Sequence, residues 1–272
     1  MPFDTSMFSP VQIQPRRLLQ LSMSGWARWL SEHLSVSFPS MVSKHHASAV
    51  VAGIELEYLE PLRFLDADIL QVRVGLSARR EGSILDLVLD YSASAKSIAC
   101  VRLVVIPVHV EDVESLSALP QKLPDELLAR FDADEVADEV AAEPRRMREE
   151  LRALRKEKPA CERRTPFTIH RHMCEVADQW SFIELPGLVE PGREAICLDP
   201  PPRFDELRAG VSQRLVRIDA ELRRPFFAFD TGILVTRAYV LPSRIVYVHE
   251  LRSARGRNHR HATVIEQFEV AA

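Results

Sequence analysis

Hydrophobic and polar positions follow two different periods in the first part of the chain. Between 18 and 34 apolar residues recur at helical spacing, which predicts one long helix. The run 11–14 alternates apolar and polar residues and predicts a short strand before that helix. Apolar, strand-favouring runs at 47–59, 69–76, 83–91 and 97–108 predict an antiparallel meander. One long helix wrapped by such a sheet is an α+β arrangement.

The second part of the chain shows the same order of periods. A short strand is predicted at 166–169, and a helix at 181–198 that Pro186 and Pro191 should kink or interrupt. Strands are predicted at 211–222, 232–241, 244–251 and 261–270. The two parts therefore look like two copies of one unit.

A repeated block of thirteen residues supports this duplication. Residues 58–70 read YLEPLRFLDADIL and residues 222–234 read LRRPFFAFDTGIL, so that Pro61 matches Pro225 and Asp66 matches Asp230, each 164 positions later. Two copies favour a duplicated domain over a solenoid, which needs at least three repeats. Since both copies keep the aspartate, we interpret Asp66 and Asp230 as turn residues.

A charged connector separates the copies and sets the domain boundaries at 1–110, 111–162 and 163–272. Its first part, 111–143, is acidic, and 145–158 is basic and favours a helix. We predict a solvated helical linker packed over the sheet. The alternative is a docking surface for an acidic carrier protein, formed by five arginines: Arg145, Arg146, Arg148, Arg152 and Arg155.

Composition narrows the class of protein. The 272 residues are 46% hydrophobic and 27% charged, as in a globular protein with a core. A net charge of −4 disfavours nucleic acid as a partner. The four cysteines form no CxxC pair, and no apolar run reaches the ~20 residues of a membrane span. We therefore expect a soluble cytoplasmic protein with reduced thiols.

The repeated block also resembles a known family. Tyr58-Leu59-Glu60-Pro61-Leu62, followed by 66–72 (DADILQV), is similar to the Y-x-x-P-L-x-x-G-D-x-L-x-V segment of the 4-hydroxybenzoyl-CoA thioesterase family. The resemblance extends to acyl-carrier-protein thioesterases of the hotdog superfamily. It implies a double hotdog, in which two units form a pseudo-dimer within one chain and join their sheets.

The catalytic signature of that family, D-x-x-G-H-x-N-N, is lost in the first copy. Its positions hold residues that cannot act as a general base: Leu19, Ser22, Met23, Gly25 and Trp26. Matching PVQI at 10–13 with PFTI at 166–169 gives a separation of 156, which carries the signature to the second copy. There the positions hold Glu175, Asp178, Gln179, Ser181 and Phe182. The resemblance thus implies a carboxylate at Glu175, with Asp178-Gln179 in place of Gly-His.

Thioester hydrolysis needs a carboxylate near the carbonyl group and hydrogen-bond donors for the oxyanion. Glu175 is the candidate base or nucleophile, Gln179 a donor, and Asp178 a residue that orients water. Backbone amides of 179–182 at the helix N-terminus are the candidate oxyanion donors. We expect Trp180, Ser181, Phe182 and His249 to contact substrate. The alternative for Glu175 is a capping or helix-dipole role.

Other reactive residues suggest no further chemistry. His170 and His172 share a strand face, but their spacing is not a recognised ligand pattern, so we predict no metal and no cofactor. Cys174 is interpreted as an inert thiol rather than a nucleophile.

The sequence thus predicts an enzyme that hydrolyses an acyl-CoA or an acyl-carrier-protein thioester. A dehydratase or lyase on a carrier-bound β-hydroxyacyl group is one alternative, although the Y-x-x-x-G-D-x-N-P-x-H pattern does not occur. A non-catalytic acyl-binding scaffold is the other, favoured by the altered signatures. The oligomeric state stays open, with a homo-oligomer of double units as one arrangement.

Overall fold

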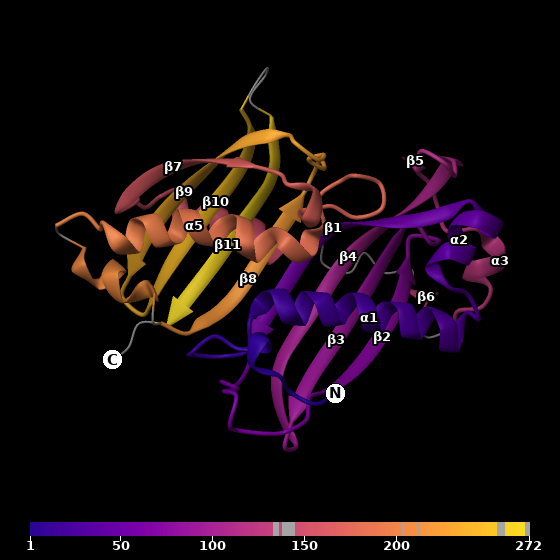
Figure 1. The fold of residues 1–272 in the computed structure, drawn as a ribbon, viewed down its shortest axis with the longest axis horizontal. Helices are drawn as coiled ribbons and strands as arrows, with labels where there is room; N and C mark the ends of the chain where they lie inside the picture. Colours follow the sequence, from indigo (N-terminus) through magenta and orange to yellow (C-terminus); the bar gives the residue numbers. More distant parts are fainter. Residues whose placement is uncertain (133–135, 138–144, 203, 212, 255–258, 270–272) are drawn as a thin grey trace.

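A single sheet runs through the whole protein (Figure 1), and its strand pairs are antiparallel except for one parallel pair at an edge. The computed structural model describes residues 1–132, 136–137, 145–202, 204–211, 213–254 and 259–269. The strand order is β6-β2-β3-β4-β1-β8-β11-β10-β9-β7, with β5 paired to β4. The strands are β1 (Ala47–Tyr58), β2 (Gln71–Arg79), β3 (Ile84–Ala93), β4 (Lys96–Asp112), β5 (Ser117–Pro120), β6 (Val136–Ala137), β7 (Cys161–Thr168), β8 (Leu215–Leu222), β9 (Thr231–Leu241), β10 (Arg244–Ser253) and β11 (Arg260–Glu269).

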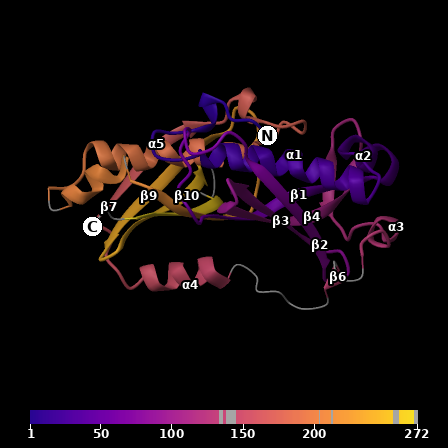
Figure 2. The same cartoon turned by 90° about the horizontal axis from the view of Figure 1, so that it is seen from below.

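Two long helices lie on one face of this sheet, one over each half (Figures 1 and 2). The α-helices are α1 (Pro15–His33), α2 (Phe38–His45), α3 (Asp125–Leu128), α4 (Arg145–Leu154) and α5 (Leu185–Leu198). The 3₁₀ helices are η1 (Thr5–Met7), η2 (Arg171–Met173), η3 (Phe182–Glu184) and η4 (Asp205–Val211). Helix α1 packs on β2, β3 and β4, and α5 packs on β7, β9 and β10. The predicted α+β double layer, one helix wrapped by each half-sheet, is confirmed.

The two halves meet at β1 and β8, and their pairing obeys the sequence repeat. Glu55 pairs with Asp219, which lies 164 positions later and is its counterpart in the second copy. An antiparallel pair centred on equivalent residues places a pseudo-twofold axis between the units. The duplication predicted from residues 58–70 and 222–234 is therefore built into the sheet.

The turns of the repeated block are also equivalent. The Asp66 carboxylate accepts a hydrogen bond from the Arg63 amide at 2.7 Å, and the Asp230 carboxylate accepts one from the Phe227 amide at 2.8 Å. Both are local side-chain-to-backbone bonds of the kind that aspartate supplies in turns. The interpretation of both aspartates as turn residues is confirmed.

Helix α4 covers the opposite face of the sheet (Figure 2). Met147 and Leu154 pack against the outer faces of β9, β10 and β11, next to Tyr239 and Val248. Arg146 forms ion pairs with Asp219 at 3.2 Å and with Glu57 at 3.1 Å. Residues 145–154 of the connector thus form a helix that packs over the sheet. Arg146 thus contacts the sheet while 40% of its side chain is exposed, and the docking surface stays a prediction.

The predicted strand at 11–14 is wrong. Ser9 and Gln12 close a turn, in which the Ser9 amide donates to the Gln12 carbonyl oxygen at 2.8 Å, and Ile13 makes only an isolated bridge to Phe8. Pro10 and Pro15 flank this turn and lack the amide hydrogens that a ladder requires. Several other boundaries differ by two to four residues: β2 begins at Gln71 and β8 at Leu215.

The helix register of the second copy also differs from the prediction. Helix α1 begins two residues after Ile13, whereas α5 begins sixteen residues after Ile169, so the separation of 156 does not hold within the helices. Two glycines mark a close approach of each helix to the sheet. A Cβ at Gly25 would contact Val74 on β2, and one at Gly192 would contact Leu234 on β9, the equivalent strand. These glycines are 167 positions apart, and α5 continues through Pro191 without interruption.

The helices of the described residues include none that is both long enough and apolar enough to cross a membrane.

Candidate active site

The segment between η2 and η3 folds into a narrow hairpin over residues 174–180. Cys174 and Trp180 form an antiparallel bridge. The Glu175 amide donates to the Gln179 carbonyl oxygen at 2.9 Å, and the Asp178 amide donates to the Glu175 carbonyl oxygen at 3.0 Å. Asp178 takes a left-handed conformation with φ of +54°, which aspartate tolerates better than most residues. Glu175 and Gln179 thus face each other across the tip of the hairpin.

The repeated block holds this hairpin in place. The Trp180 amide donates to the Phe226 carbonyl oxygen, and the Ala228 amide donates to the Asp178 carbonyl oxygen, both at 2.9 Å. The Phe226 side chain is 1% exposed and meets the Trp180 ring edge to face. Residues 226–228 therefore fix the position of the hairpin relative to the sheet.

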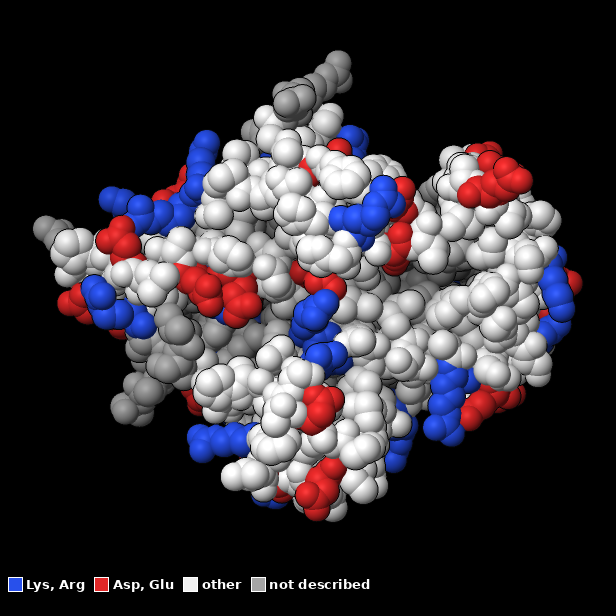
Figure 3. Space-filling view, viewed as in Figure 1, with Lys and Arg blue, Asp and Glu red and all other residues white. Residues whose placement is uncertain are grey.

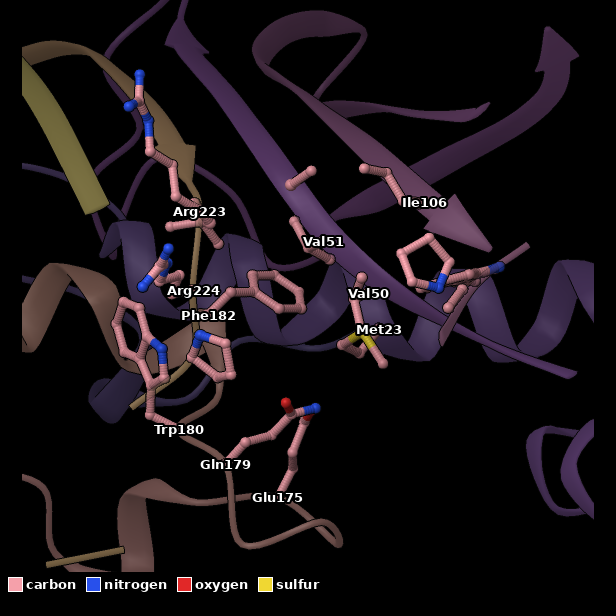
Figure 4. A pocket seen from close by; sticks show the side chains of 16 residues that line it. Met23, Val50, Val51, Ile106, Glu175, Gln179, Trp180, Phe182, Arg223 and Arg224 are labelled. Atoms are coloured by element: carbon pink, nitrogen blue, oxygen red, sulfur yellow. The ribbon is translucent and has the colours of Figure 1, made fainter. Parts of the chain in front are cut away.

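The hairpin closes one side of a cavity of about 280 Å³ between the two units (Figure 4). Helix α1 and strand β1 of the first unit form the wall opposite the hairpin, and the end of β8 with the following residues forms a third side. The residues that line it are Met23, Trp26, Ala49, Val50, Val51, Ala52, Ile106, Pro120, Glu175, Gln179, Trp180, Phe182, Leu222, Arg223, Arg224 and Pro225. The cavity is mostly apolar, with its few polar groups at the hairpin and at the two arginines.

Glu175 and Gln179 form a hydrogen-bonded pair at the mouth of this cavity. The Gln179 Nε2 amide donates to Glu175 Oε1 at 2.7 Å (Figure 4). Desolvation by surrounding atoms raises the pKa of Glu175 above its usual value, and the hydrogen bond from Gln179 opposes this rise. The residue is still exposed to solvent. A substrate that covers the carboxylate would desolvate it further and make it a stronger base.

Only part of the predicted site comes together. Trp180 and Phe182 line the cavity with Glu175 and Gln179. Asp178 lies outside it and pairs with Arg171 at 2.8 Å on the surface. Ser181 also lies outside the cavity, and its hydroxyl accepts a hydrogen bond from the Ile183 amide at 3.4 Å.

His249 lies far from this cavity lining, in the core beneath α5. It is 0% exposed, and its two ring nitrogens contact Thr236 Oγ1 at 2.9 Å and Glu266 Oε2 at 3.1 Å. The sequence placed it on a strand correctly, but an alternating pattern cannot say whether an inward-facing residue reaches a cavity or the closed core.

Two of the backbone amides expected to stabilise the oxyanion already donate to carbonyl oxygens of the protein. The Trp180 amide bonds to Phe226, and the Ser181 amide donates to the Met173 carbonyl oxygen at 2.9 Å. Another donor belongs to a residue that lines the cavity: Trp26 is 2% exposed, and its indole Nε1 has no hydrogen-bond partner among the described residues. A buried donor without a partner is costly, so a ligand acceptor is a natural complement.

Sequence reasoning missed the contribution of the first unit. Met23 and Trp26 were treated as remnants of a lost signature, yet they form the wall opposite Glu175. Arg223 and Arg224 were also missed, although they stand inside the repeated block and have no basic counterparts at Leu59 and Glu60. This difference in charge between the two copies of the block could have indicated the two arginines as candidate site residues.

Thiol and metal chemistry have little support at this hairpin. Desolvation raises the pKa of Cys174, so the thiol stays protonated near neutral pH. His170 and His172 stack on each other with ring centroids 5.8 Å apart. Within the described parts of the chain, no cluster of His, Cys, Asp and Glu has a geometry that could hold a metal ion.

Comparison with known proteins rests on structure. No protein-family model matches the sequence, and no curated protein matches it either. Among solved structures, a Lactobacillus plantarum protein provisionally assigned as an oleoyl thioesterase superposes with a TM-score of 0.71 at 13% identity, covering 100% of this chain and 95% of its own. The 12:0-ACP thioesterase from Umbellularia californica gives 0.69 at 9% identity, covering 100% and 92%.

An acyl-ACP thioesterase from Bacteroides thetaiotaomicron gives a TM-score of 0.61 at 11% identity, covering 99% of this chain and 96% of its own. These similarities extend over both units and the connector. At such low identities they establish the fold, and this chain is a double hotdog.

Proposed function

We propose that this protein hydrolyses acyl thioesters in the cavity between its two units. The observation that carries the proposal is the Glu175–Gln179 pair at the mouth of a mostly apolar cavity. The proteins of the same fold that superpose over the whole chain include two named as acyl-ACP thioesterases, which supports the same class of reaction here. Among the described residues that line the cavity, Glu175 is the only carboxylate.

In the proposed mechanism Glu175 acts as the general base. Its carboxylate takes a proton from a water molecule as the water oxygen attacks the thioester carbonyl carbon. The carbon–sulfur bond then breaks, and the leaving thiolate takes the proton from the Glu175 carboxyl group, so the products are a free acid and a thiol. Gln179 holds the carboxylate in place through its 2.7 Å hydrogen bond. Direct attack by Glu175, giving an acyl anhydride that water hydrolyses, is the variant route.

Two groups on the other walls are suited to stabilise the oxyanion. The Trp26 indole N–H has no partner among the described residues. The Arg224 guanidinium lines the same cavity and adds positive charge. Donors that face a water-poor cavity stabilise a developing oxyanion more than the same donors do in water.

The cavity walls also suit an acyl thioester. Apolar side chains, among them Met23, Val51 and Phe182, would contact the acyl group. The volume of about 280 Å³ is near the lower limit of ordinary ligand pockets. CoA and acyl carrier protein both attach the acyl group through a phosphopantetheine arm, so either substrate agrees with this cavity.

The two alternative functions, a dehydratase and a non-catalytic acyl-binding protein, require different side chains in the cavity. A dehydratase of this fold would use a histidine with an acid, and none of the described residues that line the cavity is a histidine. A non-catalytic acyl-binding protein is favoured by one observation, the solvent exposure of Glu175. Product analysis separates these alternatives.

The test is incubation with a panel of acyl-CoA and acyl-carrier-protein thioesters, followed by mass spectrometry. Hydrolysis gives a free acid and a thiol in equal amounts, and this is the expected result. An enoyl product would indicate the lyase, and intact thioester retained on the protein would indicate the scaffold. Either of these two results would refute the proposed reaction. Comparing the two carriers at equal concentrations identifies the preferred substrate.

A further inference from the structure

A second cavity, of about 360 Å³, lies on the other side of the junction between the units. It is bounded by the turn before α1, by α5, and by β8 and β11. Its polar lining residues are Ser9, Gln12, Gln14, Arg16, Glu190, Arg193, Gln213 and Glu266. None of them lines the first cavity, so this is a separate site.

The two cavities are related by the pseudo-twofold axis. Ala49 and Val51 line the first, and Gln213 and Leu215, each 164 positions later, line the second. The helices repeat this relation with the separation of 167 that Gly25 and Gly192 define. Met23 and Trp26 of α1 correspond to Glu190 and Arg193 of α5. The second cavity is therefore the site of the other copy, with different side chains.

The charges in the second cavity neutralise one another. Arg193 Nη1 donates to both carboxylate oxygens of Glu266 at 2.6 Å, and Arg193 Nη2 donates to Glu190 at 3.0 Å. Arg16 pairs with Glu184 at 2.6 Å. Each charged lining residue thus has an opposite charge beside it, and Glu266, held by Arg193, is not available as a base. A phosphate or carboxylate ligand would have to break these pairs.

The unpaired polar groups in this cavity are side-chain amides. Gln12 is 3% exposed, and among the described residues neither its Nε2 nor its Oε1 has a hydrogen-bond partner of normal geometry. The neighbouring Tyr58 hydroxyl gives its proton to the Ile13 carbonyl oxygen at 2.8 Å, and its oxygen interacts with one N–H of the Gln12 amide, so the second N–H and Oε1 of Gln12 are the groups left for a ligand. Gln213 Oε1 is likewise buried and has no hydrogen-bond partner among the described residues. Buried amides of this kind need a partner, because burial without one costs stability.

We propose that the second cavity binds a neutral, amide-bearing ligand without hydrolysing it. A ligand carbonyl oxygen would accept from Gln12 Nε2, and a ligand N–H would donate to Gln12 Oε1 or Gln213 Oε1. Val11, Leu215 and Phe268 supply apolar walls for the carbons between such amides. A pantetheine arm has this chemistry, with two secondary amides joined by short carbon chains. Choosing pantetheine as the occupant rests on the proposed function, whereas the amide chemistry of the site does not.

The test is calorimetric titration of the full-length protein with pantetheine. We expect Gln12→Leu to lose one binding site per chain or to bind at least about tenfold more weakly, since one amide pair contributes on the order of a tenfold change. Gln12→Leu should also melt at a higher temperature, because it removes an unpaired buried amide. Gln213→Leu provides a second variant, with a weaker effect. Gln20→Leu, the same change on the exposed face of α1, is the matched control and should bind as the wild type does.

Equal pantetheine binding by wild type, Gln12→Leu and Gln213→Leu would overturn the proposal, and so would a wild type that shows no binding at millimolar pantetheine. Thioester hydrolysis is measured on the same samples. Loss of binding in Gln12→Leu with hydrolysis unchanged supports a separate second site. A wild type that binds pantetheine at Gln12 but hydrolyses no thioester would refute the proposed function and leave this inference standing.

Discussion

Replacing Glu266 by Gln tests the buried ion network beneath α5. Glu266 is 1% exposed and lies between Arg193, at 2.6 Å, and His249, at 3.1 Å. Burial alone would raise the pKa of this carboxyl group. The Arg193 charge, assisted by His249, outweighs burial and lowers the pKa from 4.5 to about 2. The carboxylate is therefore more stable in the folded chain than in the unfolded chain.

The size of the effect follows from this pKa difference. A lowering from 4.5 to about 2 corresponds to about 3 kcal/mol of folding free energy at neutral pH. Because the folded pKa is lowered, this stabilisation is fully present above pH 4.5 and is lost as the pH falls toward 2. Between pH 7 and about pH 3 the wild type should lose about 2 kcal/mol of it. Glu266→Gln lacks this contribution at every pH.

Urea unfolding at several pH values measures both quantities. At pH 7 we expect Glu266→Gln to unfold about 1 M urea earlier, given an m-value of about 3 kcal/mol/M for a chain of this size. The difference from the wild type should shrink toward pH 3. Glu194→Gln, on the exposed side of the same helix, should stay within about 0.5 kcal/mol of the wild type. An unchanged midpoint in Glu266→Gln, or a difference independent of pH, would refute this reasoning.

Three further experiments, two of them with a paired variant, test the packing and the site. Gly192→Ala would push a methyl group against Thr236 and to within 2.5 Å of Leu234, so it should destabilise the fold by about 1–3 kcal/mol in chemical unfolding. The added methyl group of Gly187→Ala, on the same helix, has no atom within 4 Å, so this variant should be neutral or slightly stabilising. Equal changes in unfolding free energy for Gly192→Ala and Gly187→Ala would contradict the close approach of the helix to the sheet. Trp26→Phe removes the unpartnered indole N–H and should lower kcat of thioester hydrolysis by about tenfold or more with little change in KM; a normal kcat would exclude Trp26 as a donor. Asp230→Ala loses the bond from the Phe227 amide and should cost about 1 kcal/mol, and Asp66→Ala should cost a similar amount if the two turns are equivalent.

The strands and their duplication could be predicted because strand sequences are constrained at each position. The alternation of apolar and polar residues decides which face of the sheet each strand residue occupies. A turn aspartate must also stand a set number of residues from the backbone amide that donates to it. The match of Asp66 with Asp230 therefore gave the separation of 164 that the Glu55–Asp219 pair confirms.

The helix register and half of the site could not be predicted in this way. The segment between Ile169 and α5 has no period, and its hairpin is held by long-range bonds to Phe226 and Ala228 that no local pattern reveals. The separation of 156 between 10–13 and 166–169 was therefore applied to the helices, although their close-packed glycines, Gly25 and Gly192, are 167 positions apart. It pointed to Glu175, which lines the cavity, but it treated Trp26 on the opposite wall as a remnant.

The most direct test of the proposed reaction is the initial rate of acyl-thioester hydrolysis by Glu175→Gln. We predict that this variant loses about a hundredfold or more of the wild-type rate, the usual contribution of a general base. Glu194→Gln is the matched control and should keep the wild-type rate, while both variants fold normally. A Glu175→Gln variant that hydrolyses the same thioesters at the wild-type rate would contradict the account.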